Sequence, residues 1–495
     1  PKGLAKLDAP VREILRAALA QARYMQVPVS AAVNEAVKLT RAFKKSSASG
    51  LVNAVLRKAC SYDLSTASFK NEVERLMVLG SAGRDVAEFL HKNYPDEALD
   101  ILTYKADGGM TSLRANPLKG SADELCAKLM ASGAKEAKRG IVPGSVLARF
   151  EGSPAENELF RQGYFHVEGQ ASQLAALCVD AQPGETVIDL CAAPGGKTIL
   201  LAEQMHSTGR LYSCDAAENR VGLIRTAVQR MGLTNVEALC NDATKVNPAL
   251  PQADRILADV PCSGLGILAK KPDLRYKKLE PAREAELLAT QSAILDTAAQ
   301  LLKAGGRLVY STCTIDPAEN QQQIASFLAR HPEFTLCDLN ACGFGRPGEE
   351  NRAPGCTDIT RCRRIWPADG GEGHFMAKLK KSPDAEAPVP VRVKPGKPAK
   401  TPPEWLDFVK TTFPFLADRP LTTAGDWLLL PVPGSELLNL SKLRIVRGGV
   451  LAGSVLKKRF QPAHALFMAY GARCTNREEL TLDDPRTAAW LRGEE

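Results

Sequence analysis

Apolar residues recur at helical spacing through the first 85 or so residues of the chain. Such stripes predict amphipathic helices, because the buried positions of a helix repeat every three to four residues. Ser30 is placed to cap the second helix, and a third is expected after Gly50 with Leu51, Ala54 and Val55 on its apolar face. The first two stripes are Val11, Ile14, Leu15, Ala18, Leu19 and Ala22, and then Val33, Ala36, Val37 and Thr40. Residues 1–85 are therefore predicted to form a helical domain.

The pattern changes twice farther along the chain. Residues 86–165 combine short strand-like runs with one helix that Ser121 and Glu124 open as a capping box, which predicts a small α+β subdomain. From residue 166 to 381, five short apolar runs alternate with stretches of helix length. This alternation predicts an α/β fold with a mostly parallel sheet and helices on both faces. The five runs are Thr186–Leu190, Arg210–Cys214, Val236–Cys240, Arg255–Ala258 and Arg307–Ser311.

The last part of the chain differs in composition. Residues 382–403 are rich in Pro, Lys and Ala without periodicity, which is typical of an extended linker. Residues 404–495 contain several aromatic residues and short strand-like runs, which predict a small, mostly β domain. The total of 495 residues suits several domains, because a single core rarely grows past ~250–300 residues.

Candidate chemistry lies where the predicted strands end. A Gly-rich turn, Gly195-Gly196, follows the first strand and allows close approach of a ligand to the backbone. Asp215, Asp242 and Asp259 follow the next three strands, and Asp215 has the spacing of an acidic group that meets ribose hydroxyls. The turn lacks a pyrophosphate-binding pattern. The set therefore predicts an adenosyl cofactor without pyrophosphate, S-adenosylmethionine rather than NAD.

Two cysteines also follow neighbouring runs, Cys262 after the fourth and Cys313 after the fifth. They could be buried structural thiols, since free cysteine is among the most buried residue types. They could equally be a nucleophile with a helper, which requires an accessible thiol of lowered pKa. The residues alone leave both interpretations open.

Composition narrows the class of protein only slightly. The formal net charge of +8 permits a polyanionic partner without requiring one. The 13 scattered cysteines indicate reduced thiols and a cytoplasmic location, and no membrane span or leader pattern is visible. Cys356, Cys362 and His374 lack the spacing of a zinc site, so no metal is expected.

The motifs together resemble those of the Sun/Fmu family of RNA cytosine-C5 methyltransferases. The resemblance covers roughly residues 110–380. It rests on Asp189-Leu-Cys-Ala-Ala-Pro-Gly-Gly-Lys197, Asp259-Val-Pro-Cys-Ser-Gly-Leu-Gly266, Lys271-Pro-Asp273 and Ser311-Thr-Cys-Thr314 followed by Glu319-Asn320. It implies a Rossmann-like core that binds S-adenosylmethionine.

The resemblance also implies a role for each site residue. Cys313 would attack carbon 6 of the cytosine, Asp259 would assist at N3, and Cys262 would act in release of the product. Asp215 would hold the ribose and Asp242 the adenine amino group of the cofactor. The loop around the methionine part would be Cys191, Ala192, Ala193, Pro194, Gly195, Gly196 and Lys197.

The flanking segments resemble RNA-directed domains of the same enzymes. Residues 28–35 and 50–57 resemble the later part of a NusB-type helical domain whose earlier helices are missing here, as in the RsmB-type enzymes of small-subunit ribosomal RNA. Residues 113–119 resemble the start of an RNA-recognition-like subdomain. Residues 443–449 and 457–464 resemble the C-terminal RNA-binding domain of Fmu-type relatives. The implied partner is small-subunit ribosomal RNA, bound by a monomer with no membrane contact.

A basic stretch after the Pro-Cys motif is a further candidate RNA contact, because cations follow phosphates and an aromatic side chain can stack on a base. It contains Lys270, Lys271, Arg275, Tyr276, Lys277 and Lys278. Three other functions remain open: an RNA-binding assembly factor without activity, a DNA cytosine-C5 methyltransferase and a tRNA cytosine-C5 methyltransferase. The presence of Cys313 argues against the DNA enzymes, whose nucleophile is the cysteine of the Pro-Cys motif.

Overall fold

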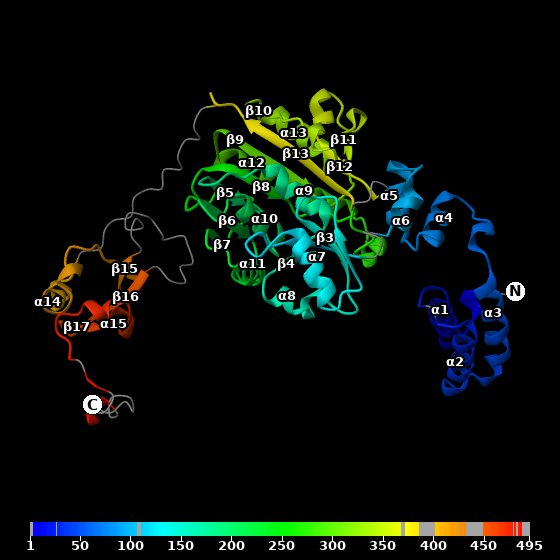
Figure 1. The fold of residues 1–495 in the computed structure, drawn as a ribbon, viewed down its shortest axis with the longest axis horizontal. Helices are drawn as coiled ribbons and strands as arrows, with labels where there is room; N and C mark the ends of the chain where they lie inside the picture. The colour runs from blue at the N-terminus through cyan, green and yellow to red at the C-terminus, as the bar shows by residue number, and fades with distance from the viewer. Residues whose placement is uncertain are drawn as a thin grey trace. The chain divides into compact units, whose positions relative to one another are not determined.

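The structure is a computed structural model that describes residues 3–25, 27–105, 110–367, 372–385, 401–424, 426–431, 449–478, 480–481 and 484–487. The chain divides into two compact units, residues 1–388 and 389–495. Figure 1 shows the course of the chain, and each unit is described by itself.

Three helices at the start of the chain, α1 (Ala9–Tyr24), α2 (Val29–Ala42) and α3 (Ser49–Ser61), share one apolar core. The prediction that Ser30 caps α2 was wrong, because Pro28 occupies the N-cap position and Ser30 lies inside the helix. The predicted face of α3 was also wrong. Val52 and Leu56 are the buried residues of α3, whereas Leu51 and Val55 are exposed. These helices carry more apolar residues than their core uses, so spacing alone did not select the buried stripe.

The next three helices, α4 (Glu72–Leu79), α5 (Arg84–Asn93) and α6 (Ala98–Thr103), belong to a different core. That core contains Leu265, Ile315 and Trp366, which come from loops of the central domain. Tyr94, directly after α5, donates its hydroxyl to the Ile315 carbonyl at 2.5 Å. Side chains far apart in sequence thus join these helices to the region around the Pro-Cys and Thr-Cys motifs.

A small antiparallel sheet with the strand order β2-β3-β1-β4 follows. Its strands are β1 (Thr111–Ala115), β2 (Glu136–Arg139), β3 (Ser145–Arg149) and β4 (Phe165–Val167), with helices α7 (Ala122–Ala131) and α8 (Glu158–Arg161). The predicted capping box is confirmed, since the Ser121 side chain accepts from the Glu124 backbone and Glu124 accepts from Ser121. The unit is α+β, as the sequence predicts.

The central domain is built on a nine-stranded sheet with the order β11-β12-β13-β9-β8-β5-β6-β7, in which β10 also pairs with β13. The five predicted apolar runs are its parallel strands. They are β5 (Thr186–Asp189), β6 (Arg210–Asp215), β7 (Val236–Cys240), β8 (Ala253–Asp259) and β9 (Leu302–Thr312). The antiparallel edge consists of β10 (Phe334–Leu336), β11 (Arg346–Pro347), β12 (Arg363–Ile365) and β13 (His374–Lys381).

Helices cover both faces of this sheet, as expected for an α/β fold. One face carries α9 (Gln170–Val179), α10 (Gly196–Gln204) and α11 (Glu218–Met231), and the other carries α12 (Pro281–Leu301) and α13 (Gln321–Arg330), as Figure 1 shows. Two apolar cores fill the space between sheet and helices. The carboxyl ends of β5, β6, β7, β8 and β9 meet at one edge, where such sheets bind ligands.

The second unit contains a four-stranded antiparallel sheet and two helices. The strands are β14 (Thr422–Ala424), β15 (Trp427–Pro431), β16 (Gly449–Leu456) and β17 (Arg459–Pro462), and the helices are α14 (Pro403–Thr412) and α15 (His464–Tyr470). They enclose a core that includes Trp405, Phe413 and Leu466. Most of the predicted linker, residues 386–400, and most of the motif at 443–449 lie outside the described residues.

Candidate active site

The two motif cysteines meet at the ends of adjacent parallel strands. Strand β8 pairs with β9 so that Asp259 lies opposite Ser311, and each strand is followed by its cysteine. The Sγ atoms of Cys262 and Cys313 are 3.2 Å apart. Both thiols are partly accessible. The sequence left open whether they were core residues, and the structure places them together at the ligand-binding edge of the sheet.

The two thiols differ electrostatically. The hydrogen bond from Cys262 lowers the pKa of Cys313, although burial of the site acts in the opposite direction. The same hydrogen bond, together with burial, raises the pKa of Cys262. Cys313 is therefore the member of the pair that ionises first, and a thiolate is the nucleophilic form of cysteine.

Asp259 forms an ion pair beside the cysteines. Its Oδ2 atom accepts from Lys197 Nζ at 2.8 Å, and its Oδ1 atom accepts from Ser311 Oγ at 2.6 Å. Burial alone would raise the pKa of Asp259, but the charge of Lys197 overcomes that effect and the pKa lies below its ordinary value. Burial likewise opposes the charge of Lys197, whose pKa is nevertheless raised by Asp259 and Glu168. Asp259 is thus an ionised acceptor with lone pairs left for a ligand.

The loop that carries Cys262 is held by Glu319, a motif residue for which the sequence alone predicts no role. Its Oε2 atom accepts from the Ser263 backbone at 2.9 Å and from Gln291 Nε2 at 2.8 Å. Ser263 Oγ also lies 2.7 Å from Thr314 Oγ1, next to Cys313. These contacts fix the two cysteine loops against each other. Glu319 therefore positions Cys262 through the backbone of Ser263.

The Gly-rich turn lies between β5 and α10 and borders a cavity of about 230 Å³. Gly195 adopts φ +110°, a conformation that favours glycine, and is the N-cap residue of α10. A Cβ on Gly196 would come within 2.9 Å of the Glu168 carboxylate. The cavity is lined by Val167, Glu168, Gly169, Ser172, Asp189, Cys191, Ala192, Ala193, Pro194, Gly196, Lys197 and Asp259.

This lining suits a small cationic ligand. Glu168 and Asp259 contribute carboxylates, whereas Lys197 is already paired with Asp259. Asp189 is fully buried; burial raises its pKa to about 7, and its Oδ1 atom has no hydrogen-bond partner among the described residues. The sulfonium of S-adenosylmethionine brings a positive charge, and the cofactor has no phosphate. Seven of the ten residues predicted to bind the cofactor line the cavity. The residues present therefore fit S-adenosylmethionine.

The other three predicted cofactor residues lie outside that lining. Gly195 forms the turn itself. Asp215 is buried at the end of β6, where it accepts from the Ala217 backbone and from Arg220. Asp242 is half exposed and accepts from Thr244 and from Lys245 Nζ at 2.7 Å, contacts that lower its pKa to about 2. The structure brings Asp215 and Asp242 to adjacent strand ends, and their roles toward ribose and adenine stay predictions.

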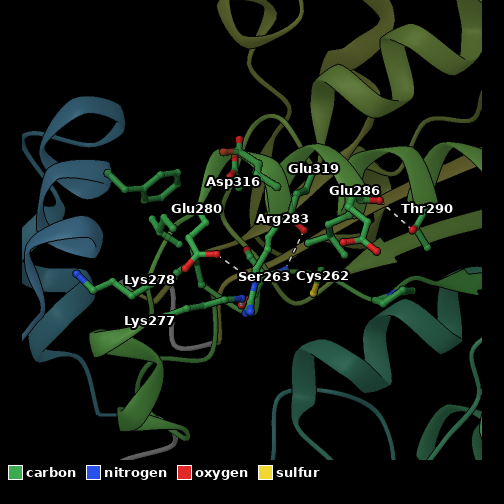
Figure 2. A pocket seen from close by; sticks show the side chains of 16 residues that line it. Cys262, Ser263, Lys277, Lys278, Glu280, Arg283, Glu286, Thr290, Asp316 and Glu319 are labelled. Atoms are coloured by element: carbon green, nitrogen blue, oxygen red, sulfur yellow. Dashed lines mark hydrogen bonds and ion pairs between the residues drawn. The ribbon is translucent and has the colours of Figure 1, made fainter.

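A second, larger cavity of about 730 Å³ is lined in part by Pro261, Cys262 and Ser263 of the Pro-Cys loop. Figure 2 shows Cys262 at its margin, with Lys277 and Lys278 along another side. The basic stretch predicted to contact RNA forms part of this wall, but several of its cations have protein partners. Lys277 donates to the Ser263 carbonyl at 2.7 Å, Lys278 pairs with Asp85, and Lys270 pairs with Glu372. Tyr276 is 62% exposed and remains accessible for stacking.

Comparisons with known proteins agree with this geometry. The family described as 16S rRNA methyltransferase RsmB/F matches residues 176–380. A protein named probable ribosomal RNA small subunit methyltransferase B from Synechocystis sp. is 36% identical over 340 residues, which are 67% of this chain and 75% of that protein. The chain belongs to the RsmB/F methyltransferase family. Its cofactor is S-adenosylmethionine, as in the family and as the cavity suggests.

Two solved structures share this fold. The crystal structure of PH0851 is 31% identical, with a TM-score of 0.60, and the match covers 76% of this chain and 84% of that one. A methyltransferase homolog protein from Pyrococcus horikoshii is 27% identical, with a TM-score of 0.55, over 63% of this chain and all of that one. Both matches agree with a Rossmann-like methyltransferase core.

The flanks of this RsmB/F-family chain also match known domains. The NusB family matches residues 2–61, which include α1, α2 and α3, and the first C-terminal domain of the RsmF rRNA methyltransferases matches residues 407–470. The resemblances to a NusB-type domain and to the C-terminal domain of the relatives are thus confirmed, and the resemblance of residues 113–119 to an RNA-recognition-like subdomain stays a prediction. In the described residues, no group of three or more His, Cys, Asp or Glu side chains could hold a metal ion. No helix in the described ranges is long and apolar enough to cross a membrane.

Proposed function

We propose that this protein methylates carbon 5 of a cytosine in small-subunit ribosomal RNA through a covalent bond between Cys313 and carbon 6 of the base. The observation that carries the proposal is the Cys262–Cys313 pair, 3.2 Å apart beside Asp259. A methyl transfer to nitrogen or oxygen needs no thiol, whereas carbon 5 of cytosine becomes nucleophilic only after a thiolate adds at carbon 6. Two thiols at the transfer site therefore favour carbon 5.

Each residue has a distinct part in this reaction. The Cys313 thiolate forms the bond to carbon 6, and the electron pair of the 5,6 double bond moves toward carbon 5 and the ring. The addition leaves negative charge on the ring, and N3 takes up a proton from solvent as it forms; ionised Asp259 would accept a hydrogen bond from that N3–H and so favour the addition. S-adenosylmethionine supplies an electrophilic methyl group on its sulfonium. Cys262 then assists loss of the carbon 5 proton, the bond from carbon 6 to sulfur breaks, and Cys313 leaves as a thiolate.

The substrate class rests on the relatives. Curated relatives are named ribosomal RNA small subunit methyltransferase B, and the family description specifies 16S rRNA. The exposed Tyr276 beside the Pro-Cys loop offers a stacking surface for a base taken out of its helix. The flanking matches to the NusB family and to the first C-terminal domain of RsmF rRNA methyltransferases further support an RNA substrate.

The direct test is transfer of labelled methyl groups from S-adenosylmethionine. The full chain is offered small-subunit RNA as naked RNA and as assembled subunit, and tRNA and DNA in parallel. Mass spectrometry of the digested RNA should find 5-methylcytidine at one position. Preferential transfer to tRNA or DNA, or label on another atom of the base, would contradict the proposal. Cofactor binding without transfer to any nucleic acid would instead favour an inactive assembly factor.

A further inference from the structure

His374 is a buried histidine that the cysteine chemistry does not use. It begins strand β13 and is only 2% exposed. Neither of its ring nitrogens has a hydrogen-bond partner among the described residues. Burying a polar group without a partner costs free energy, and each such group in a folded protein calls for an explanation. In the sequence, His374 stands out only by its place near Cys356 and Cys362, without the spacing of a zinc site.

The register of the sheet places His374 beside the catalytic cysteine. Strand β13 pairs with β9 so that Phe375 lies opposite Thr312 and Met376 opposite Ser311. Because side chains alternate between the faces of a strand, His374 shares its face with Met376 and therefore with Ser311, the residue that hydrogen-bonds Asp259. The pairing ends at Phe375 and Thr312, and the same register continued by one residue would set His374 opposite Cys313.

The groups around His374 are those of the active site. Its electrostatic neighbours are Lys197, Asp259 and Lys270. On the same face, Met376 packs against α9, whose first turn contributes Ser172 to the cofactor cavity. Burial lowers the pKa of His374 to about 3, so its ring is neutral and carries one N–H donor and one acceptor nitrogen.

A neutral donor and acceptor at this place match a pyrimidine better than a phosphate. A phosphate oxygen favours cations, and the nearby cations Lys197 and Lys270 are paired with Asp259 and Glu372. Cytosine has an amino group that donates and a carbonyl oxygen that accepts, and both can be satisfied by an uncharged imidazole. A histidine that only fills space would be replaced by an apolar ring without loss.

We propose that His374 is a substrate-positioning residue that hydrogen-bonds the target base while Cys313 adds to it. The proposal rests on the proposed function, since it requires a base in the site. It assigns recognition of the base to two elements, Asp259 at the end of β8 and His374 at the start of β13.

Three variants test the proposal in the full chain. His374→Phe keeps the ring and removes both nitrogens. His374→Asn retains a polar atom near the Nδ1 position, and His374→Gln retains one near the Nε2 position. Met376→Leu is the matched control, because Met376 is the next residue on the same face and belongs to an apolar cluster with residues of α9. Each variant is assayed for methyl transfer to small-subunit RNA, for S-adenosylmethionine affinity by calorimetry and for thermal stability.

His374→Phe should lower kcat/KM for RNA about tenfold, the loss that corresponds to one hydrogen bond, with cofactor affinity unchanged. Either His374→Asn or His374→Gln should restore the rate to within about threefold of wild type, and Met376→Leu should not change it. A wild-type rate in His374→Phe would overturn the proposal, and so would failure of both polar variants to exceed it. If the wild-type chain methylates no RNA, the proposed function fails, and the inference fails with it.

Discussion

Replacing Cys262 with alanine should make Cys313 less acidic, and the size of the change follows from one contact. Cys262 lies 3.2 Å from Cys313 and lowers its pKa by donating a hydrogen bond. A hydrogen bond to a charged group contributes about 1.5–3 kcal/mol, and a thiol donor belongs at the lower end. Since one pKa unit corresponds to about 1.4 kcal/mol, the pKa of Cys313 should rise by about one unit.

The assay is alkylation of Cys313 by iodoacetamide as a function of pH, read peptide by peptide by mass spectrometry because the chain has 13 cysteines. In Cys262→Ala the midpoint should move up by about one unit. Near pH 7 the rate should fall only about threefold, because a more basic thiolate is also more nucleophilic and offsets part of the smaller thiolate fraction.

The matched control is Cys240→Ala, which removes an exposed thiol at the end of β7 and should leave the Cys313 profile unchanged. The converse variant Cys313→Ala removes the other partner of the pair. An unchanged midpoint in Cys262→Ala would refute the electrostatic argument. If Cys262 rather than Cys313 titrates first in the wild-type protein, the assignment of donor and acceptor within the pair is reversed.

Three further predictions follow from the site. Cys262→Ala should accumulate a covalent protein–RNA complex on denaturing gels, whereas Cys313→Ala should form none; the opposite pattern would exchange their roles. Lys197→Met should destabilise the protein by on the order of 3 kcal/mol in chemical denaturation, because Asp259 loses its buried cation, and Lys197→Met/Asp259→Asn should recover part of that loss. The pKa of Asp189 is raised to about 7, so the folded protein favours the protonated carboxyl, and this contribution to stability is present below pH 4 and lost as pH rises through 7. Asp189→Asn should therefore flatten the dependence of Tm on pH between pH 4 and pH 7.

The sequence predicts strands and capped helix starts better than it predicts which helix faces and loops pack together. The inner parallel strands β5, β8 and β9 were found because a strand buried on both faces is a short, continuous apolar run, and the capping box at Ser121 is a local signal within four residues. The buried face of α3 was missed because Leu51, Val52, Val55 and Leu56 are all apolar, and only packing distinguishes them. The joining of α4, α5 and α6 to loops near the active site depends on contacts across more than 150 residues, which no local pattern encodes.

The dependence on long-range contacts also explains which residues of the active site could be predicted from the sequence. Cys262 and Asp259 are close in sequence, but their proximity to Cys313 depends on β8 lying next to β9, which is a property of strand order. His374 begins a strand that pairs antiparallel with β9 and lies one residue beyond the pair of Phe375 and Thr312, so no spacing in the sequence relates it to Cys313. An active site assembled at strand ends combines local motifs with neighbours set by sheet topology. The residues that carry motifs are the ones a sequence reveals, and the residues that complete the binding of a substrate are found only when the strand order is known.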